Sequence, residues 1–457
     1  MIVLGVDGLD WQFVDAHRDE LPTLASWPVL TPLQSIFPPD SIPAWTTIFT
    51  GIPPGEHGYL DSIDYLDDVP DEAATSAAQG LPGRTFWDRA GEAGHRVCVV
   101  NPFLAYPAWE VNGAMVSGPV FVGGAPSITG TTREALPELP QLGGIVAFPT
   151  ERTIGPFVED TLQVTEEQAR FGLSLLDDLC PDLFFINILT VDRLQHFAWR
   201  FADPADPTYP GPNAHQDAVL RGYQQIDRLA GEYAKRGPVV MLSDHGHGMR
   251  CRRMVYVDEV LRRNGLVDKA GGRTPVLSRS YLLERAKRLT LLTAYSLRAE
   301  RVAYSIGRRL PNRKAIKYSS FSSDADSSIA RLSRTFGRNQ HSGVELTVDT
   351  AENRDRVREA LTVLRDPQID SSVVEWVLDR ESVVSGARVA RYPEILFKLK
   401  DGYGVDFGLY GGVFGPDVNH RRISGGHKER GVLACSFAAD SPPAGIEGMH
   451  DFILRLL

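Results

Sequence analysis

Six aspartate and histidine residues stand after short apolar runs or in Gly-rich loops, where their side chains could bind metal ions. They are Asp7, Asp192, His196, Asp244, His245 and His427. Three carboxylates and three imidazoles form a donor set that suits Zn²⁺ or Mn²⁺ and is large enough for two ions. The sequence therefore predicts two divalent ions, with Zn²⁺ the expected metal and Mn²⁺ the alternative.

The spacing of two pairs supports this interpretation. In Asp192-x-x-x-His196, a helix would place both side chains on one face. In Asp244-His245, adjacent side chains diverge, which lets one turn of the backbone serve two ions. Each element alone has a simpler explanation, because an Asp after a strand is commonly a cap and a lone His in a loop is usually a surface residue. The combination of all six favours a metal site.

A serine stands between a Pro-rich entry and a helical pattern in FPPDSIPAWTTIFTG, and it could cap the helix or act as a nucleophile. Capping is commonplace, because a side-chain oxygen accepts hydrogen bonds from the free N–H groups of the first turn. This residue, Ser41, has no obvious His or Lys base beside it in the sequence. Metal coordination could replace the base, and the helix N-terminus would add N–H donors, although Pro43 removes one.

The elements that must position these residues follow an α/β pattern. Short apolar runs at 2–6, 183–189 and 238–242 lead directly to the candidate ligands, as buried parallel strands do at their carboxyl ends. Helical patterns at 166–179 and 218–235 lie between them, and 431–437 is a further buried strand. The sequence therefore predicts a mostly parallel sheet with helices on both faces.

Composition and charge divide the chain into a core and an insertion. The chain has 457 residues and a net charge of −10, which does not indicate a nucleic-acid partner. Residues 279–317 contain eleven Lys or Arg against two Glu. We expect a core of 1–265 and 341–457, with 266–340 as an inserted, partly helical basic cap. Residues 279–317 are either a solvated cap, a lid over an anionic substrate or a helix at a membrane surface.

The location predicted from the sequence is cytoplasmic. Four widely spaced cysteines form neither a metal knuckle nor a disulfide framework, and the N-terminus runs straight into a strand without a basic or cleavable leader. The pattern does not indicate an oligomeric state.

Several motifs resemble the alkaline phosphatase superfamily, specifically its type I phosphodiesterase/nucleotide pyrophosphatase branch. They are GVDG at 5–8, the serine before PAWTTIFTG, DRLQHFAW at 192–199, SDHGHG at 243–248 and SGGHKERGVL at 424–433. The resemblance implies a three-layer α/β/α fold and a dinuclear centre. One ion would be bound by Asp192, His196 and His427, and the other by Asp7, Asp244, His245 and the Ser41 oxygen.

The resemblance also implies a reaction. Ser41 would attack a small phosphorylated substrate and form a phosphoseryl intermediate, which water hydrolyses. The expected activity is that of a phosphodiesterase or nucleotide pyrophosphatase. The alternatives are a phosphomutase or phosphomonoesterase of the same superfamily and, less favoured, a non-catalytic binding protein.

Two departures from the related families narrow this expectation. Sulfatases carry an arginine where this chain has Trp45, which argues against sulfate esters. Nucleotide pyrophosphatases usually have Thr as the nucleophile and an Asn near the position of Ser62. Ser62 and His57 are therefore candidate substrate contacts, although a structural hydrogen bond is the favoured role for His57.

Overall fold

The chain folds into two compact units. The computed structural model describes residues 1–60, 80–119, 127–130, 149–267, 279–309, 328–409 and 411–457. Unit 1 comprises Met1–Met249 and Arg422–Leu457, and unit 2 comprises Arg250–Arg421. All seven residues predicted to bind metal belong to unit 1.

Unit 1 is built on an eight-stranded, mostly parallel sheet. In spatial order its strands are β2 (Val29–Gln34), β19 (Arg430–Cys435), β7 (Val239–Leu242), β1 (Ile2–Val6), β6 (Leu183–Ile188), β3 (Val97–Val100), β4 (Gly113–Ser117) and β5 (Ser127–Gly130). Strands β7 through β4 in this order are parallel. Strands β19 and β2 at one edge and β5 at the other pair antiparallel. The predicted strand at 431–437 is therefore present but runs against its neighbour β7.

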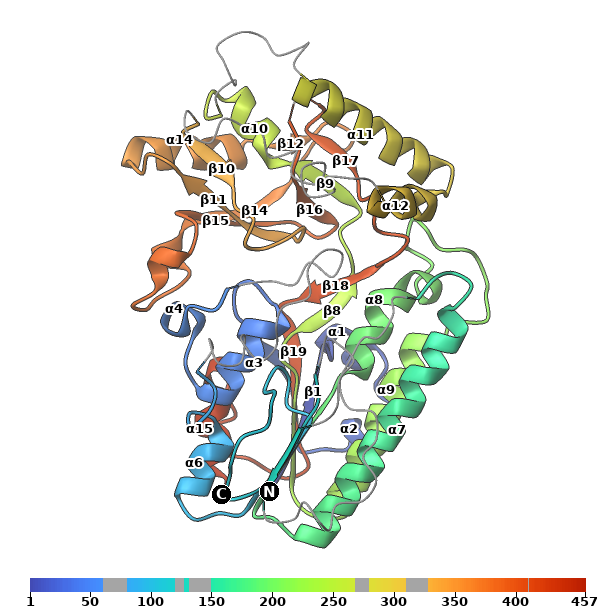
Figure 1. The fold of residues 1–457 in the computed structure, drawn as a ribbon, viewed down its shortest axis with the longest axis vertical. Coiled ribbons are helices and arrows are strands. Elements are labelled where there is room, and N and C mark those ends of the chain that lie inside the picture. Colours follow the sequence, from blue (N-terminus) through green and yellow to red (C-terminus); the bar gives the residue numbers. More distant parts are fainter. Residues whose placement is uncertain (61–79, 120–126, 131–148, 268–278, 310–327, 410) are drawn as a thin grey trace. The chain divides into compact units, whose positions relative to one another are not determined.

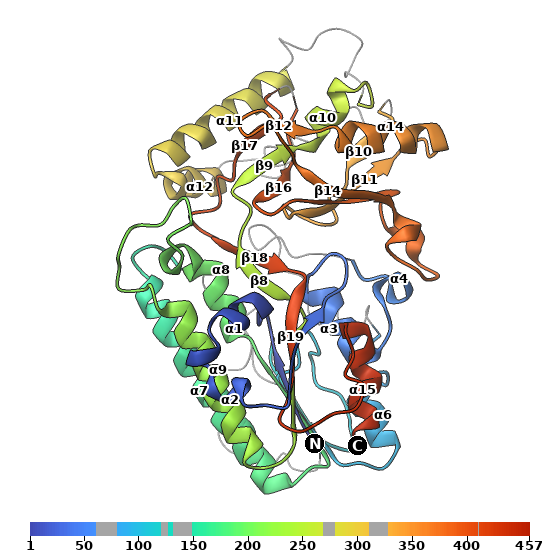
Figure 2. The ribbon, with the colours of Figure 1, turned by 180° about the vertical axis from the view of Figure 1, so that it is seen from behind.

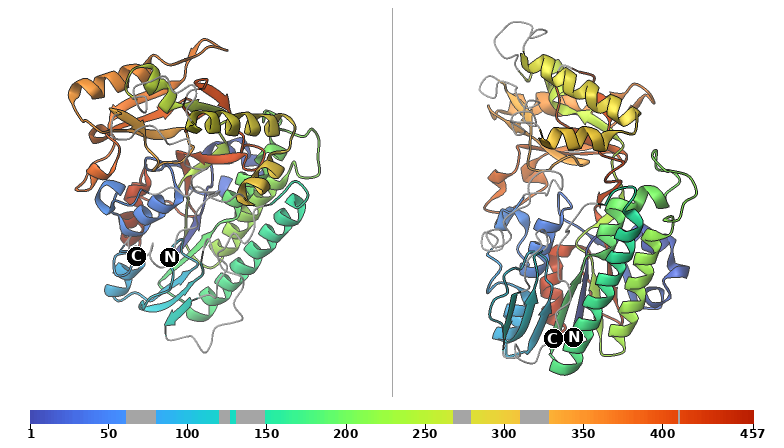
Figure 3. Two further views of the ribbon diagram at one scale, coloured as in Figure 1. Left: turned by 45° about the horizontal axis from the view of Figure 1, so that its top comes forward. Right: turned by 45° about the vertical axis from the view of Figure 1, so that its right-hand side comes forward.

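Helices cover both faces of this sheet, as Figures 1 and 2 show from opposite sides and Figure 3 from two further angles. One layer contains α1 (Trp11–Ala16), α2 (Pro22–Ala25), α7 (Ile154–Leu179), α8 (Thr190–Ala202) and α9 (Ala218–Ala234). The other contains α3 (Ser41–Thr50), α6 (Phe86–Glu92) and α15 (Met449–Arg455), with the short α4 (Pro54–His57) beside α3. An apolar core lies on each face of the sheet. Within β1, Leu4 packs in the core on the side of α7, α8 and α9, and Val3 packs in the core on the side of α3, α6 and α15. Because both faces are buried, the central strands are continuous apolar runs. The predicted three-layer α/β/α fold is confirmed.

The helix predicted for residues 166–179 begins twelve residues earlier, at Ile154. Its first half contains threonines that the sequence pattern does not favour in a helix. Thr161 and Thr165 are buried there, and each hydroxyl donates to the carbonyl four residues earlier. Because the helix backbone satisfies these hydroxyls, polar residues can occupy its buried face.

A two-stranded ribbon extends unit 1 beyond the main sheet. Strand β8 (Gly246–Met249) pairs antiparallel with β18 (Gly425–Lys428), which places His247 opposite His427 and Met249 opposite Gly425. Unit 2 lies between these two strands in the sequence. The ribbon therefore brings together residues that the chain separates widely.

Unit 2 has its own core and three small sheets. The strands are β10 (Ala330–Leu332), β11 (His341–Leu346), β15 (Ile395–Leu399) and β14 (Val374–Asp379) in one sheet, β16 (Tyr403–Asp406), β9 (Arg253–Tyr256) and β17 (Phe414–Pro416) in the second, and β12 (Arg365–Asp366) with β13 (Ser371–Ser372) in the third. Helices α10 (Val257–Arg263) and α14 (Ala351–Thr362) pack against this core. The unit extends on both sides of the predicted insertion at 266–340, because its apolar core includes residues from Val255 to Phe414.

The basic part of unit 2 forms two helices, α11 (Arg279–Ser296) and α12 (Glu300–Arg309). Arg288 of α11 lies over the Tyr256 ring and Arg421 lies over Tyr295, so part of the charge packs inside the unit. Large apolar side chains are exposed along the same segment: Leu282, Leu289, Leu297, Val302 and Ile306. Across the described residues, no helix has the length and hydropathy needed to cross a membrane. Contact with a membrane surface stays a prediction.

Candidate active site

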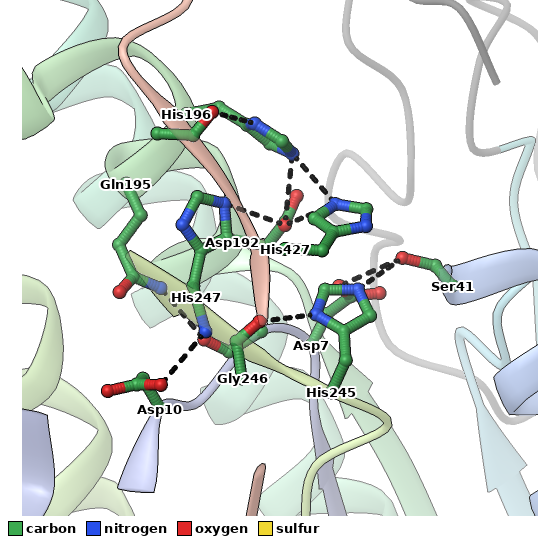
Figure 4. A network of polar contacts seen from close by, with 12 residues as sticks. Asp7, Asp10, Ser41, Asp192, Gln195, His196, His245, Gly246, His247 and His427 are labelled. Carbon is green, nitrogen blue, oxygen red and sulfur yellow. Dashed lines mark hydrogen bonds and ion pairs between the residues drawn. The ribbon is translucent and has the colours of Figure 1, made fainter. Parts of the chain in front are cut away.

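The predicted ligands converge at the carboxyl ends of the central parallel strands (Figure 4). Asp7 follows β1, and its N–H continues the ladder by donating to the carbonyl of Ile188 at the end of β6. Asp192 and His196 lie one turn apart at the beginning of α8, which starts directly after β6. Asp244 and His245 follow β7, while His427 lies in β18 and Ser41 begins α3. Asp192 and His196 therefore share a helix face, and Asp244 and His245 share a bend of the backbone, as their spacing in the sequence predicts.

Asp192, His196 and His427 form the first cluster of candidate ligands. Asp192 Oδ1 lies 3.2 Å from His196 Nε2 and 3.6 Å from His427 Nε2, and the two nitrogens lie 3.1 Å apart. Donors of a tetrahedral site lie about 3.3–3.4 Å from one another when each is about 2.0–2.1 Å from the metal. The three donor atoms thus have the separation that a zinc-sized ion requires.

The hydrogen bonds of the two imidazoles leave their Nε2 atoms ready to bind a cation. Nδ1 of His196 lies 3.2 Å from the carbonyl of Gly425, and Nδ1 of His427 lies 3.1 Å from that of Pro39. A carbonyl only accepts, so each Nδ1 carries the proton and each Nε2 presents a lone pair. Burial, with His245 and His196 nearby, lowers the pKa of His427 well below its usual range and keeps it neutral. Two lone pairs that face each other at 3.1 Å fit a shared cation.

The second cluster contains Ser41, Asp7, His245 and Asp244. Ser41 Oγ lies 3.3 Å from Asp7 Oδ1 and 2.9 Å from His245 Nε2. His245 Nε2 lies 3.7 Å from Asp7 Oδ1 and 3.2 Å from Asp244 Oδ2. Nδ1 of His245 donates to the carbonyl of Gly246, so its Nε2 also presents a lone pair. These distances again match the edges of a metal-binding polyhedron.

Asp7 and Asp244 are buried close to other carboxylates. Burial, followed by the charges of Asp244 and Asp192, raises the pKa of Asp7 well above its usual range. Burial likewise raises the pKa of Asp244 to about 6. Asp192 Oδ1 and Asp244 Oδ2 are buried without a hydrogen-bond partner among the described residues. A buried anionic oxygen without a partner is costly, and a divalent ion offsets that cost. The residues present therefore fit two metal ions.

The structure corrects three expectations about Ser41. Asp40, whose Oδ1 accepts from the Ile42 N–H, is the cap of α3, so the Ser41 side chain is not used for capping. The helix N-terminus offers fewer donors than expected, because the Ile42 and Ala44 N–H groups both donate to Asp40 and Pro43 has none. The sequence showed no His or Lys beside Ser41, but the fold brings His245 Nε2 within 2.9 Å of the Ser41 Oγ atom.

Trp45 has a role that the sequence did not reveal. Its indole N–H donates to Asp7 Oδ2 at 2.9 Å, and its ring is buried against Gly5. A Cβ atom on Gly5 would lie only 2.8 Å from the Trp45 ring. The tryptophan therefore fixes the oxygen of Asp7 that does not face Ser41, and Gly5 leaves the space for it.

We expect Trp45→Phe to lower the free energy of unfolding of the metal-free protein by about 1–3 kcal/mol, because Asp7 Oδ2 loses its donor in a buried environment. Chemical denaturation measures the difference. Trp199→Phe is the matched control, because it removes an indole N–H bond to Asp203 at a partly exposed position. Equal effects of the two substitutions would contradict a special role for the bond to Asp7.

The two candidate substrate contacts have different outcomes. His57 ends α4, and its Nε2 lies 3.2 Å from Thr47 Oγ1 while its Nδ1 accepts from the Tyr59 N–H. These contacts support the structural role that the sequence favoured. Ser62 lies outside the described residues. His247, which is not one of the predicted ligands, lies in β8 beside the first cluster.

Comparison with known protein families gives a match over most of the chain. A family model described as type I phosphodiesterase/nucleotide pyrophosphatase matches residues 1–369, a range that ends before His427. No curated protein sequence matches the chain.

Two solved structures of one hydrolase share the fold. Phosphonoacetate hydrolase from Sinorhizobium meliloti 1021 in complex with phosphonoformate has 15% sequence identity and a TM-score of 0.56, over 99% of this chain and 94% of that one. The same hydrolase in complex with phosphonoacetate has 15% identity and a TM-score of 0.53 over the same shares. Human ectonucleotide pyrophosphatase/phosphodiesterase 5 has 11% identity and a TM-score of 0.47, over 100% of this chain and 94% of that one.

Proposed function

The chain belongs to the type I phosphodiesterase/nucleotide pyrophosphatase family of phosphoric ester hydrolases, and from this premise we propose that it cleaves small phosphodiesters with Ser41 as the nucleophile. The observation that carries the proposal is the position of the Ser41 hydroxyl. It is buried beside Asp7 and His245, and it contacts both Asp7 Oδ1 and His245 Nε2. A capping or packing serine has no need of such neighbours.

Each cluster would hold one divalent ion. Asp192, His196 and His427 would bind the first ion, and Asp7, Asp244, His245 and Ser41 Oγ the second. When bound, such ions lower the pKa of a coordinated hydroxyl and neutralise charge on phosphoryl oxygens. We propose Zn²⁺, because the first cluster contains two imidazoles that present Nε2 lone pairs; Mn²⁺ is the alternative that the carboxylates allow.

The residues of the chain position the nucleophile and take part in the bond changes at phosphorus. Asp40 caps α3 and thereby fixes Ser41 at the first helical position, where its Oγ faces the second cluster. In the attack, Oγ forms a bond to phosphorus and one ester oxygen leaves with the bonding electrons and takes up a proton. Water then attacks phosphorus, which restores the Ser41 hydroxyl and releases a phosphomonoester.

Hydrolysis in ¹⁸O-labelled water tests the proposal. With bis-p-nitrophenyl phosphate and added Zn²⁺ or Mn²⁺, we expect p-nitrophenol and singly labelled p-nitrophenyl phosphate, detected by mass spectrometry. A chelator should abolish turnover, and re-addition of the ion should restore it. The phosphomutase alternative predicts phosphoryl transfer to an acceptor alcohol without label. The phosphomonoesterase alternative predicts faster release of labelled phosphate from p-nitrophenyl phosphate than from the diester.

A binding protein without activity would show divalent-ion binding but no turnover on diesters, monoesters or nucleotide sugars. That result would contradict the proposed function. The family match and the buried serine both favour the enzyme.

A further inference from the structure

His247 lies beside the first cluster without belonging to the predicted ligand set. It is buried in β8, and Figure 4 shows its ring turned toward Asp192. Its Nε2 lies 3.6 Å from Asp192 Oδ1 and has no hydrogen-bond partner among the described residues. The ring meets that of His196 edge-on, with 4.5 Å between centroids. A buried ring nitrogen in this position is either a further metal ligand or a hydrogen-bond donor.

The proton position separates the two roles. In His196, His245 and His427, Nδ1 faces a backbone carbonyl and Nε2 is left with a lone pair. His247 has the opposite arrangement, because its Nδ1 accepts from the Gly248 N–H at 3.0 Å. A ring nitrogen that accepts carries no proton, so the ring as a whole is neutral. The single proton of the ring is therefore on Nε2.

We propose that His247 is a positioning residue whose Nε2–H donates to Asp192 Oδ1, and that it orients this carboxylate for the ion bound by Asp192, His196 and His427. The inference rests on the metal site of the proposed function. The distance of 3.6 Å exceeds a hydrogen bond by a few tenths of an ångström, and a small rotation of the Asp192 carboxylate closes it. Outer partners of this kind fix ligand orientation in metal sites.

Ligation by His247 is the less favourable arrangement. Binding through Nε2 would require the proton on Nδ1, where it would face the Gly248 N–H at 3.0 Å. Two donors would then oppose each other in a buried place, which costs a hydrogen bond and adds repulsion.

The surroundings hold the ring in place. The backbone N–H of His247 donates to Asp10 Oδ2, while Asp10 Oδ1 caps α1 through the Phe13 N–H. On the other side, a Cβ atom on Gly425 would lie 2.6 Å from His247 Cε1, so the ring packs directly on the glycine backbone. The donor therefore approaches Asp192 from a fixed direction.

Zinc affinity of His247→Gln and His247→Leu tests the proposal. Each full-length variant is stripped of metal and titrated with Zn²⁺ against a chromophoric chelator. The glutamine amide can replace Nε2–H, so we expect His247→Gln to stay within about threefold of the wild type. We expect His247→Leu to weaken zinc binding by about 10–100-fold at the site formed by Asp192, His196 and His427, while two ions still bind. His196→Gln is the matched control, because the same substitution at a ligand should remove one ion from the stoichiometry.

Two further measurements make the outcome specific. X-ray absorption of the zinc-loaded protein should count the same number of imidazoles per zinc in the wild type and in His247→Gln. Thermal unfolding of the metal-free variants checks that each is folded. The proposal is overturned if His247→Leu binds zinc as tightly as the wild type, or if both variants lose an ion as His196→Gln does. A wild-type protein that binds no divalent ion would overturn the proposed function together with this inference, whereas two bound ions with indifferent variants would overturn this inference alone.

Discussion

Replacement of Ser41 by alanine is expected to lower kcat for phosphodiester hydrolysis by about 10³-fold or more, while the protein keeps its fold and its affinity for metal at the first cluster, and binds the second ion more weakly because one of its ligands is gone. The loss follows because removal of a nucleophile eliminates the covalent route and leaves only direct attack by water. The substitution removes a buried hydroxyl but no core methylene, so we expect only a small change in stability.

Steady-state kinetics and elemental analysis on the same preparation measure the two effects. Thr46→Ala is the matched control, because its hydroxyl lies in the same helix and donates only to the carbonyl of Ile42 at 2.8 Å. Brief incubation of the wild type with substrate, followed by acid quench and peptide mass spectrometry, should locate phosphate on Ser41. Turnover by Ser41→Ala at the wild-type rate would exclude the serine as nucleophile.

Asp192→Asn is the second substitution with a large expected effect, because Asp192 belongs to the first cluster and also has a carboxylate oxygen within 4.8 Å of ligand atoms of Asp7 and His245 in the second. Its Oδ1 lies within 3.2–3.6 Å of the Nε2 atoms of His196, His247 and His427. Loss of the negative charge removes a ligand from the first cluster. It also reduces the electrostatic attraction for the ion in the second cluster. We expect fewer than two ions per chain and a fall in kcat/KM of about 10³-fold.

Elemental analysis and calorimetric titration with Zn²⁺ measure this change. Asp203→Asn, at the other end of α8, is the control, since its carboxylate bonds Trp199 and the backbone of Ala205 and takes no part in either cluster. Retention of two tightly bound ions by Asp192→Asn would remove this carboxylate from the metal centre.

The positions of the candidate metal ligands could be predicted because each belongs to a local pattern. Asp7, Asp192 and Asp244 follow apolar runs, and the carboxyl ends of neighbouring parallel strands meet at one edge of a sheet. Strand direction was harder to predict, because a buried apolar run such as β19 has the same composition whether it runs parallel or antiparallel. Only the pairing with its neighbours distinguishes the two.

The roles of Trp45 and His247 depend on contacts between distant parts of the chain. Trp45 reaches Asp7 across 38 positions, and no spacing rule predicts that bond. For His247, the one available clue was its place two residues after His245 in a Gly-rich turn, and only the hydrogen bond from Gly248 fixes its proton. The extent of unit 2 was missed for another reason. Charge marks a surface, whereas a compact unit is defined by the apolar side chains that it buries.

The pairing of β8 with β18 has a consequence for how such an enzyme can diversify. Unit 2 leaves the ribbon after Met249 and returns just before Gly425, two residues that lie opposite each other in the ribbon. The whole of Arg250–Arg421 is thus an elaborated hairpin loop, and its length places no constraint on the strands that carry His247 and His427. A recombination event could exchange this loop for a shorter or unrelated one while His247 and His427 stay paired in the ribbon. Replacement of the loop would therefore leave the candidate metal-binding residues of unit 1 on their own strands and helices.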